Sequence, residues 1–132
     1  MGDPRLGVRL KEARTAAAWP LAEMLVSGVL TTLTSDAPIA TPDWRPSLDA
    51  SLQLVTAAGA RDDAHTRRRL LRSMTAEAAR QDGAAHWKGT LEPGRVADLT
   101  VLDEDPLAAG RAFADLTVER TIVDGRTVYA RG

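Results

Sequence analysis

Apolar residues recur every three or four positions over two stretches of the first half of the chain, which is the spacing of an amphipathic helix. The first stretch predicts a short helix that begins at Pro20 and ends at Gly28, because proline suits the first helical turn and glycine accepts the left-handed conformation of a helix end. The second begins at Leu48 and lasts until Gly59, after an irregular segment that contains Trp44. Two helices are therefore predicted here.

A third, longer helix is predicted over residues 65–82. Asp62 and Asp63 precede it and suit its N-terminus, and Gly83 closes it. Its beginning is strongly basic, with four arginines: Arg67, Arg68, Arg69 and Arg72. A basic run of this kind is usually a solvated face that pairs with nearby aspartates. An anion site is the alternative, and the overall charge of the chain gives it no support.

Strand patterns occupy one short segment and the last third of the chain. Residues 29–34 are rich in β-branched side chains and too short for a helix, so they predict a strand that leads into a loop at Asp36. Residues 96–101 alternate between two faces. Two further strand-like runs within residues 117–130 are joined by Asp124-Gly125, a strong hairpin pattern. Antiparallel strands are therefore expected to dominate the end of the chain.

Composition narrows the classes of function. The chain has 132 residues, 44% of them hydrophobic, which is enough for a domain with a core. A net charge of −1 provides no general attraction to nucleic acid or to an anionic membrane. The absence of cysteine excludes disulfides, thiolate metal sites and cysteine nucleophiles. No apolar run resembles a signal peptide or a membrane span, so a cytoplasmic protein is the expectation.

One acidic residue stands where the predicted strand gives way to a loop. In "TSDAPI", residues 34–39, the combination of Ser, Asp and Pro favours a turn, because Asp bonds its own backbone and Pro restricts φ. Taken alone, the stretch is best explained as a turn. The alternative is that Asp36 stands at the catalytic rim of a β/α barrel, where strand ends supply ligands and bases.

Longer motifs carry a family resemblance. "GTLEPGRVADLTVLDEDPL", residues 89–107, followed by "VERTIVDGRTVY", closely resembles the C-terminal part of the amidohydrolase superfamily, in the branch of the N-substituted formamide deformylases. "TSDAPI" resembles the motif of the eighth barrel strand, and "LLRSMTAEAARQDG" resembles the helical segment that leads out of the barrel. "RLGVRLKEARTAAAWPLAEMLVSGV", residues 5–29, is similar to the helix before that strand. The resemblance covers nearly the whole chain.

This resemblance implies an α/β fold. Residues 1–88 would be the last strand and C-terminal helices of an incomplete (β/α)8 TIM-type barrel, and residues 89–132 would be strands of the small amidohydrolase β-sandwich. It also implies hydrolysis of small-molecule amide-type C–N bonds at one or two divalent ions, with zinc the expected metal. The aspartate of strand 8 contacts the metal and activates the attacking water in that family, and both roles would fall on Asp36.

The chain departs from the family in its histidines. The family site needs a His-x-His pair and further histidines, whereas this chain has only His65 and His86, at a helix start and in a loop. Neither is expected to be a metal ligand, so the chain alone is expected to bind no metal and to be inactive. The remaining motif residues are interpreted as turn and strand-end positions: Gly94, Asp98, Asp105, Pro106 and Gly125. Asp98 is expected to bond nearby backbone.

Three hypotheses remain open at this point. The chain is the inactive C-terminal part of a metal-dependent hydrolase, a non-catalytic interaction module, or one subunit of a split hydrolase that another chain completes. The sandwich strands would lack their N-terminal partners, which leaves edges and an apolar face uncovered. Self-association or a complementing chain is therefore expected in place of nucleic acid or a membrane.

Overall fold

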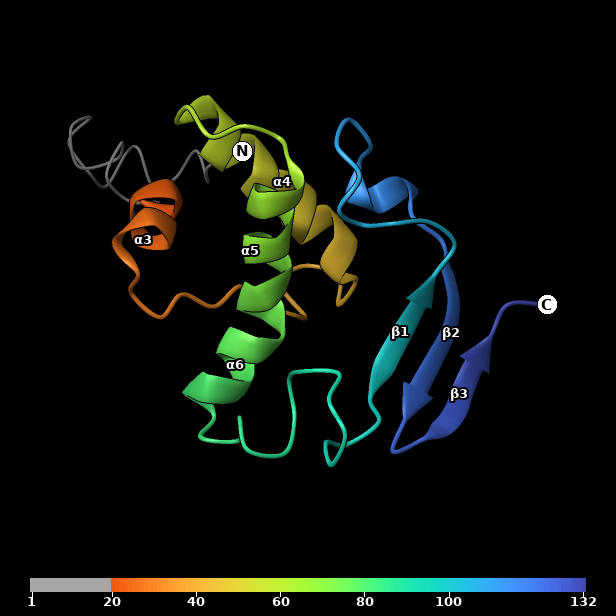
Figure 1. Ribbon diagram of the computed structural model, residues 1–132. Helices are drawn as coiled ribbons and strands as arrows, with labels where there is room; N and C mark the ends of the chain where they lie inside the picture. The colour runs from red at the N-terminus through yellow and green to blue at the C-terminus, as the bar shows by residue number, and fades with distance from the viewer. Residues whose placement is uncertain (1–19) are drawn as a thin grey trace.

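The computed structural model describes residues 20–132 as a group of helices beside a three-stranded antiparallel sheet (Figure 1). The helices of this part of the chain are α3 (Leu21–Ser27), α4 (Trp44–Ala57), α5 (Ala64–Met74) and α6 (Ala76–Gln81). The sheet has the order β1-β2-β3, with strands β1 (Leu99–Leu102), β2 (Val118–Val123) and β3 (Arg126–Ala130). A 3₁₀ turn, η1 (Phe113–Asp115), lies between β1 and β2 in the chain. The segment similar to the family helix extends into residues 5–19, which are outside the described part.

The first two predicted helices are present. α3 ends at Gly28, whose φ of 76° is the left-handed conformation predicted for it. α4 begins earlier than predicted. Trp44 is its first residue, so the prediction of an irregular segment around Trp44 is wrong. The Asp43 carboxylate accepts a hydrogen bond from the Arg45 backbone N–H at 3.1 Å and so caps this helix. Pro46 then falls within the first turn, where proline costs no hydrogen bond.

The long helix predicted over residues 65–82 is two helices. Asp63 caps α5 as predicted, since its carboxylate accepts from the Thr66 backbone N–H at 2.9 Å. The helix is then interrupted at Thr75, whose backbone is not helical (φ −123°, ψ −91°), and α6 begins at the next residue. The Thr75 hydroxyl donates to the Leu71 carbonyl at 2.9 Å, a local bond that competes with the helical ladder.

Residues 29–34 form no strand in the structure. The segment runs between α3 and α4, and the Leu33 N–H donates to the carbonyl of Ser73 on α5 at 3.2 Å. A strand requires a neighbouring strand to bond its backbone groups, and the described sheet contains only β1, β2 and β3. The prediction of a strand is therefore wrong for the chain as described.

The hairpin of β2 and β3 is confirmed. Asp124 and Gly125 both have positive φ, 50° and 73°, as a two-residue type I′ turn requires. The alternation predicted over residues 96–101 is not kept, because Leu99 is half-buried whereas Ala97 and Val101, expected on the same face, are exposed. The β1–β2 register shifts just beyond this segment, between Val101 and Leu102, and Leu102 is half-buried.

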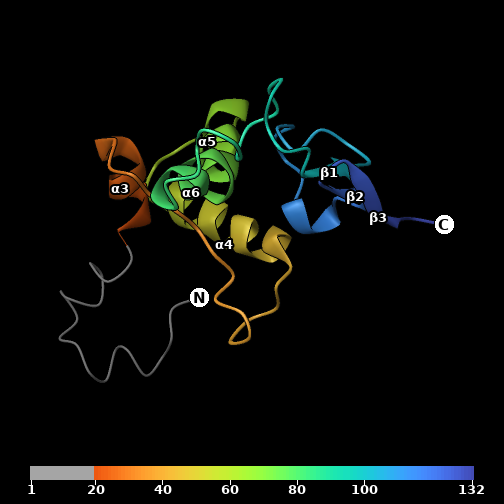
Figure 2. The same cartoon turned by 90° about the horizontal axis from the view of Figure 1, so that it is seen from below.

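The core lies among the helices and η1, to one side of the sheet (Figure 2). Its buried members are Leu48, Leu52, Val55, Leu70, Phe113 and Leu116. Leu102 of β1 packs against this cluster, whereas β3 is exposed along its whole length. The fold is thus a mixed one, in which an antiparallel sheet is attached to a helical core. None of the helices in residues 20–132 is long and apolar enough to cross a membrane.

Candidate functional site

Asp36 lies in the loop that joins α3 to α4. Its φ of 57° is left-handed, a conformation that Asp tolerates better than most residues. The Ile39 N–H donates to the Asp36 carbonyl at 2.9 Å and closes a turn, and the Asp36 N–H lies 3.4 Å from the Thr34 hydroxyl oxygen. The turn predicted from the local sequence is therefore present. The residue is exposed, and its carboxylate makes no hydrogen bond to residues 20–132.

The structure does not bring the histidines to Asp36. His65 is exposed in the first turn of α5, and His86 is exposed in the loop after α6, beside Trp87. Among the described residues, no three His, Asp or Glu side chains gather in a way that could hold a metal ion. A catalytic zinc requires about three protein ligands, and Asp36 provides one carboxylate. Residues 20–132 therefore do not fit a catalytic metal by themselves.

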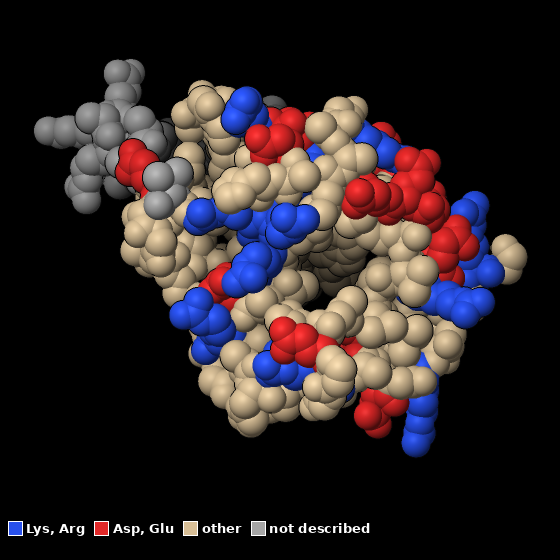
Figure 3. Space-filling model, viewed as in Figure 1, with Lys and Arg blue, Asp and Glu red and all other residues tan. Residues whose placement is uncertain are grey.

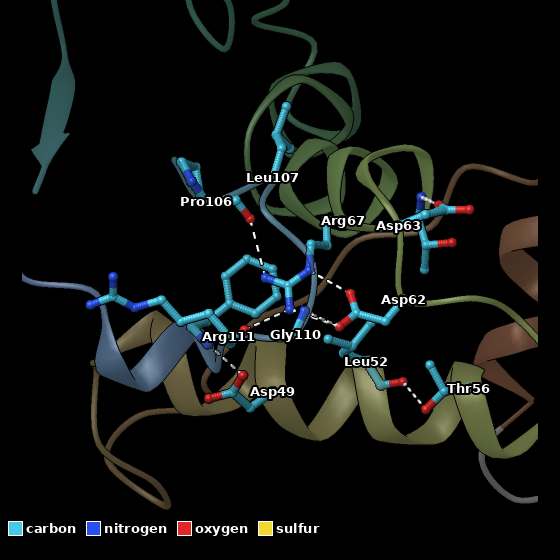
Figure 4. Close-up of polar contacts among 12 residues, drawn as sticks. Asp49, Leu52, Thr56, Asp62, Asp63, Arg67, Pro106, Leu107, Gly110 and Arg111 are labelled. Carbon is cyan, nitrogen blue, oxygen red and sulfur yellow. Dashed lines mark hydrogen bonds and ion pairs between the residues drawn. The ribbon is translucent and has the colours of Figure 1, made fainter. Parts of the chain in front are cut away.

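A buried arginine lies at the centre of the polar contacts between the helices and the loop after β1 (Figure 4). The side chain of Arg67 is only 2% exposed. Its Nε donates to Asp62 Oδ1 at 2.5 Å, and its Nη2 donates to the carbonyl of Arg111 at 2.6 Å. The guanidinium also lies over the ring of Phe113, 4.8 Å from the centroid. The predicted pairing with a nearby aspartate is thus confirmed for Arg67, whereas the predicted solvation is wrong, because this side chain is buried.

Two carboxylates complete this cluster. Asp62 also accepts from the Gly110 N–H at 2.9 Å, and the hydrogen bond from Arg67 holds the pKa of Asp62 below its ordinary value. Asp49 of α4 accepts from the backbone N–H groups of Phe113 and Ala114, at 2.7 and 2.9 Å. Sequence reasoning missed Asp49, since its partners are 64 and 65 residues away. In the sequence, the pair Asp62-Asp63 predicted the start of α5, but nothing in it predicted that Arg67 is buried.

Comparisons with known proteins identify the family of the chain. The model of the amidohydrolase family matches residues 2–129, almost the whole sequence. The chain belongs to the amidohydrolase family. It is 36% identical, over 117 residues, to the N-substituted formamide deformylase of Arthrobacter pascens. It also resembles the crystal structure of an amidohydrolase from Thermotoga maritima MSB8, with a TM-score of 0.64 and 28% identity.

These matches define what part of an amidohydrolase is present. The alignment with the deformylase covers 86% of this chain and 22% of the relative, and the structural match covers 84% of this chain and 26% of the solved one. The chain therefore spans about a quarter of the length of these relatives. The resemblance to the C-terminal part of the amidohydrolases is confirmed, and members of this family are generally metal-dependent.

In this amidohydrolase chain two motif aspartates, Asp98 and Asp105, have the structural contacts predicted for them. Asp98 accepts from the Asp124 N–H at 2.7 Å, so it bonds nearby backbone and anchors the hairpin. Asp105, just before Pro106, accepts from the Leu107 N–H at 2.8 Å and closes a turn. Gly94 and Gly125 both have positive φ, 84° and 73°, which explains the glycines at these places.

Proposed function

We propose that this chain is the C-terminal part of a metal-dependent amidohydrolase that hydrolyses small-molecule amide-type C–N bonds other than peptide bonds, and that the chain alone is inactive. The match to the amidohydrolase family over residues 2–129 carries the proposal. The name of the Arthrobacter pascens relative supports an amide-type substrate. In this proposal residues 1–88 correspond to the last strand and helices of the barrel, and residues 89–132 to the sandwich.

In the proposed complete enzyme Asp36 is both a metal ligand and the catalytic base. In the complete enzyme residues 29–34, which form no strand in the described chain, would be the last barrel strand, with Asp36 at its end. The Asp36 carboxylate is exposed and so accessible to another part of a site. Asp36 would be one of the residues that hold a divalent ion, with zinc as the expected metal, and the ion would supply Lewis-acid activation of water. The carboxylate of Asp36 would then accept a proton as the base. The other ligands must come from outside residues 20–132.

Reconstitution tests this proposal. We would assay hydrolysis of an N-substituted formamide, with zinc present, by this chain alone and by this chain mixed with the rest of the Arthrobacter pascens deformylase, produced separately. We expect activity only in the mixture. The matched variant Asp36→Asn should join the complex equally well, as measured by native mass spectrometry, and give no activity. Hydrolysis by this chain alone, or full activity of the Asp36→Asn mixture, would contradict the proposal.

A non-catalytic interaction module is the second candidate, and the exposure of β3 favours it. Val128 and Tyr129 are 63% and 49% exposed, and β3 is an edge of the described sheet. An edge with apolar side chains can pair with another strand, either from a second copy or from a complementing chain. Native mass spectrometry of the purified chain distinguishes a monomer from an assembly of two or more copies. A monomer at all concentrations would argue against self-association.

A further inference from the structure

We propose that α5 and α6 form a binding site for a small phosphate-like oxyanion, independent of the hydrolase function. The site is a cavity of about 370 Å3 between these helices and the segment that follows α3. Its charged lining residues are Arg68, Arg69, Arg72, Arg80 and Glu77. We call this cavity the basic cleft. Asp36 is not among the residues that line it.

The charge of the basic cleft differs from that of the whole chain. Its four guanidinium groups and one carboxylate leave a formal charge of +3 with His65, which also lines the cleft, counted as neutral, whereas the chain as a whole carries −1. Blue side chains gather over α5 and α6 on the face shown in Figure 3. A concave surface of one charge sign raises the local concentration of ions of the opposite sign. The local charge thus supports the anion site that the overall charge did not.

Glu77 organises part of the basic cleft. Its two oxygens accept from Arg72 Nη2 at 2.8 Å and from Arg80 Nη1 at 2.9 Å, and the hydrogen bond from Arg72 lowers the pKa of Glu77. A guanidinium has five N–H donors, so these bonds leave both arginines able to bind a ligand. Glu77 pairs with Arg72 and Arg80, and so it does not neutralise Arg68 and Arg69.

The opposite wall of the basic cleft is apolar. Leu25 of α3, followed by Val29 and Leu30, lines this side, and Val29 is 60% exposed. The volume lies within the range of small-molecule pockets. Several guanidinium groups on one side suit the multiple oxygens of a phosphate group, since arginine binds such groups through paired hydrogen bonds. The ligand class that fits is therefore a phosphate monoester with a small apolar substituent.

Inorganic phosphate is the first probe of the basic cleft. We would titrate the chain with phosphate by isothermal calorimetry at constant ionic strength, with chloride as the reference salt. The double variant Arg68→Gln/Arg69→Gln should weaken phosphate binding by about tenfold or more, because it removes two charged donors. Arg126→Gln on β3 is the matched control, since it removes an exposed charge outside the cleft and should leave the affinity unchanged.

A variant with the opposite expected effect completes the test. Glu77→Gln removes the one carboxylate of the basic cleft and should tighten phosphate binding by up to about fivefold. This result remains informative even if the double arginine variant fails to fold. Absence of saturable binding to the unaltered chain would overturn the proposal. Equal affinity of the unaltered chain, the double variant and Glu77→Gln would indicate an adventitious ion only and would overturn it as well.

Discussion

Arg67 joins parts of the chain that are far apart in sequence. Besides Asp62, its guanidinium bonds the carbonyls of Pro106 and Arg111, which are 39 and 44 residues away. A buried charge is tolerated only when it is paired and its donors are bonded, and both conditions are met here. Arg67 is therefore the side chain that fastens α5 to the loop between β1 and η1.

Replacing this arginine should destabilise the chain. Arg67→Met keeps an unbranched side chain but removes the charged partner of Asp62 and the donor to two carbonyls, and we expect the free energy of unfolding to fall by about 2–4 kcal/mol. Arg68→Met, on the exposed side of the same helix, should change it by less than about 0.5 kcal/mol. Urea denaturation monitored by circular dichroism measures both variants. Equal effects at the two positions would show that the buried contacts of Arg67 do not matter.

The lowered pKa of Asp62 makes stability depend on pH. A carboxylate whose pKa is lower in the folded state than its ordinary value of 3.8 stabilises the fold above that value, and the contribution is lost as the pH falls through the folded pKa. We therefore expect the free energy of unfolding to decrease below about pH 4. Asp62→Asn should be less stable near neutrality and should show a smaller acid-dependent loss. An unchanged acid profile would refute this role.

Asp36 should contribute little to stability, whatever its role in a complete enzyme. Its carboxylate is exposed and unbonded within the described part of the chain, and Asn also tolerates a left-handed φ. Asp36→Asn should thus change the free energy of unfolding by less than about 0.5 kcal/mol. Urea denaturation at neutral pH measures it. A loss well above that value would reveal a structural contact of this carboxylate.

At the scale of elements, the end of α5 and the start of α6 are held by contacts from outside the helices. Gly89 packs on this break: a Cβ placed there would lie 2.6 Å from Ala79 Cβ and 3.2 Å from the Thr75 carbonyl oxygen. The φ of Gly89 is also positive, at 95°. The turn after α6 can therefore approach the helix only because residue 89 has no side chain.

Gly89→Ala should disturb this packing. We expect a loss of about 2–4 kcal/mol in the free energy of unfolding, from the unfavourable φ and from the displaced backbone. Gly94→Ala is the matched control, because Gly94 also has positive φ, 84°, but no atom lies within 4 Å of the Cβ position. It should cost about 1 kcal/mol, from φ alone. If thermal or urea unfolding gave equal losses for the two variants, the close approach would not be the cause.

At the scale of the whole molecule, the core and the sheet are unequally covered. The buried cluster lies among α4, α5 and η1, and Leu102 is the sheet residue packed against it. Strand β3 is exposed along its length, so the sheet has apolar surface and an open edge in the described chain. This arrangement agrees with a chain that spans about a quarter of its relatives' length.

Metal binding is a property of the whole chain and can be measured as the ratio of zinc to protein. After incubation with zinc and gel filtration, the chain should retain far less than one equivalent, because Asp36 supplies a single carboxylate and the two histidines lie elsewhere. Atomic absorption of the eluted protein gives the ratio, and Asp36→Asn should give the same ratio. Retention of a full equivalent by the unaltered chain would mean that its own side chains form a complete site.

The sequence by itself determined the structural features that depend on neighbouring residues. It also determined the family. The left-handed end at Gly28, the Asp63 cap and the Asp124-Gly125 turn each depend on residues a few positions apart, so pattern and turn chemistry predicted them. The motif of residues 89–107 indicated the amidohydrolases, because it is a contiguous stretch of sequence that can be compared with a family without knowledge of the fold.

Only the tertiary structure decided the rest. The burial of Arg67, the bonding of Asp49 to Phe113 and the break at Thr75 depend at least in part on segments that meet across the fold, up to 64 residues apart. Residues 29–34 have the composition of a strand, but a strand forms only where another strand bonds its backbone. In this chain that segment instead bonds α5 at Ser73. Local preference thus determined what each segment could become, and the available partners determined what it became.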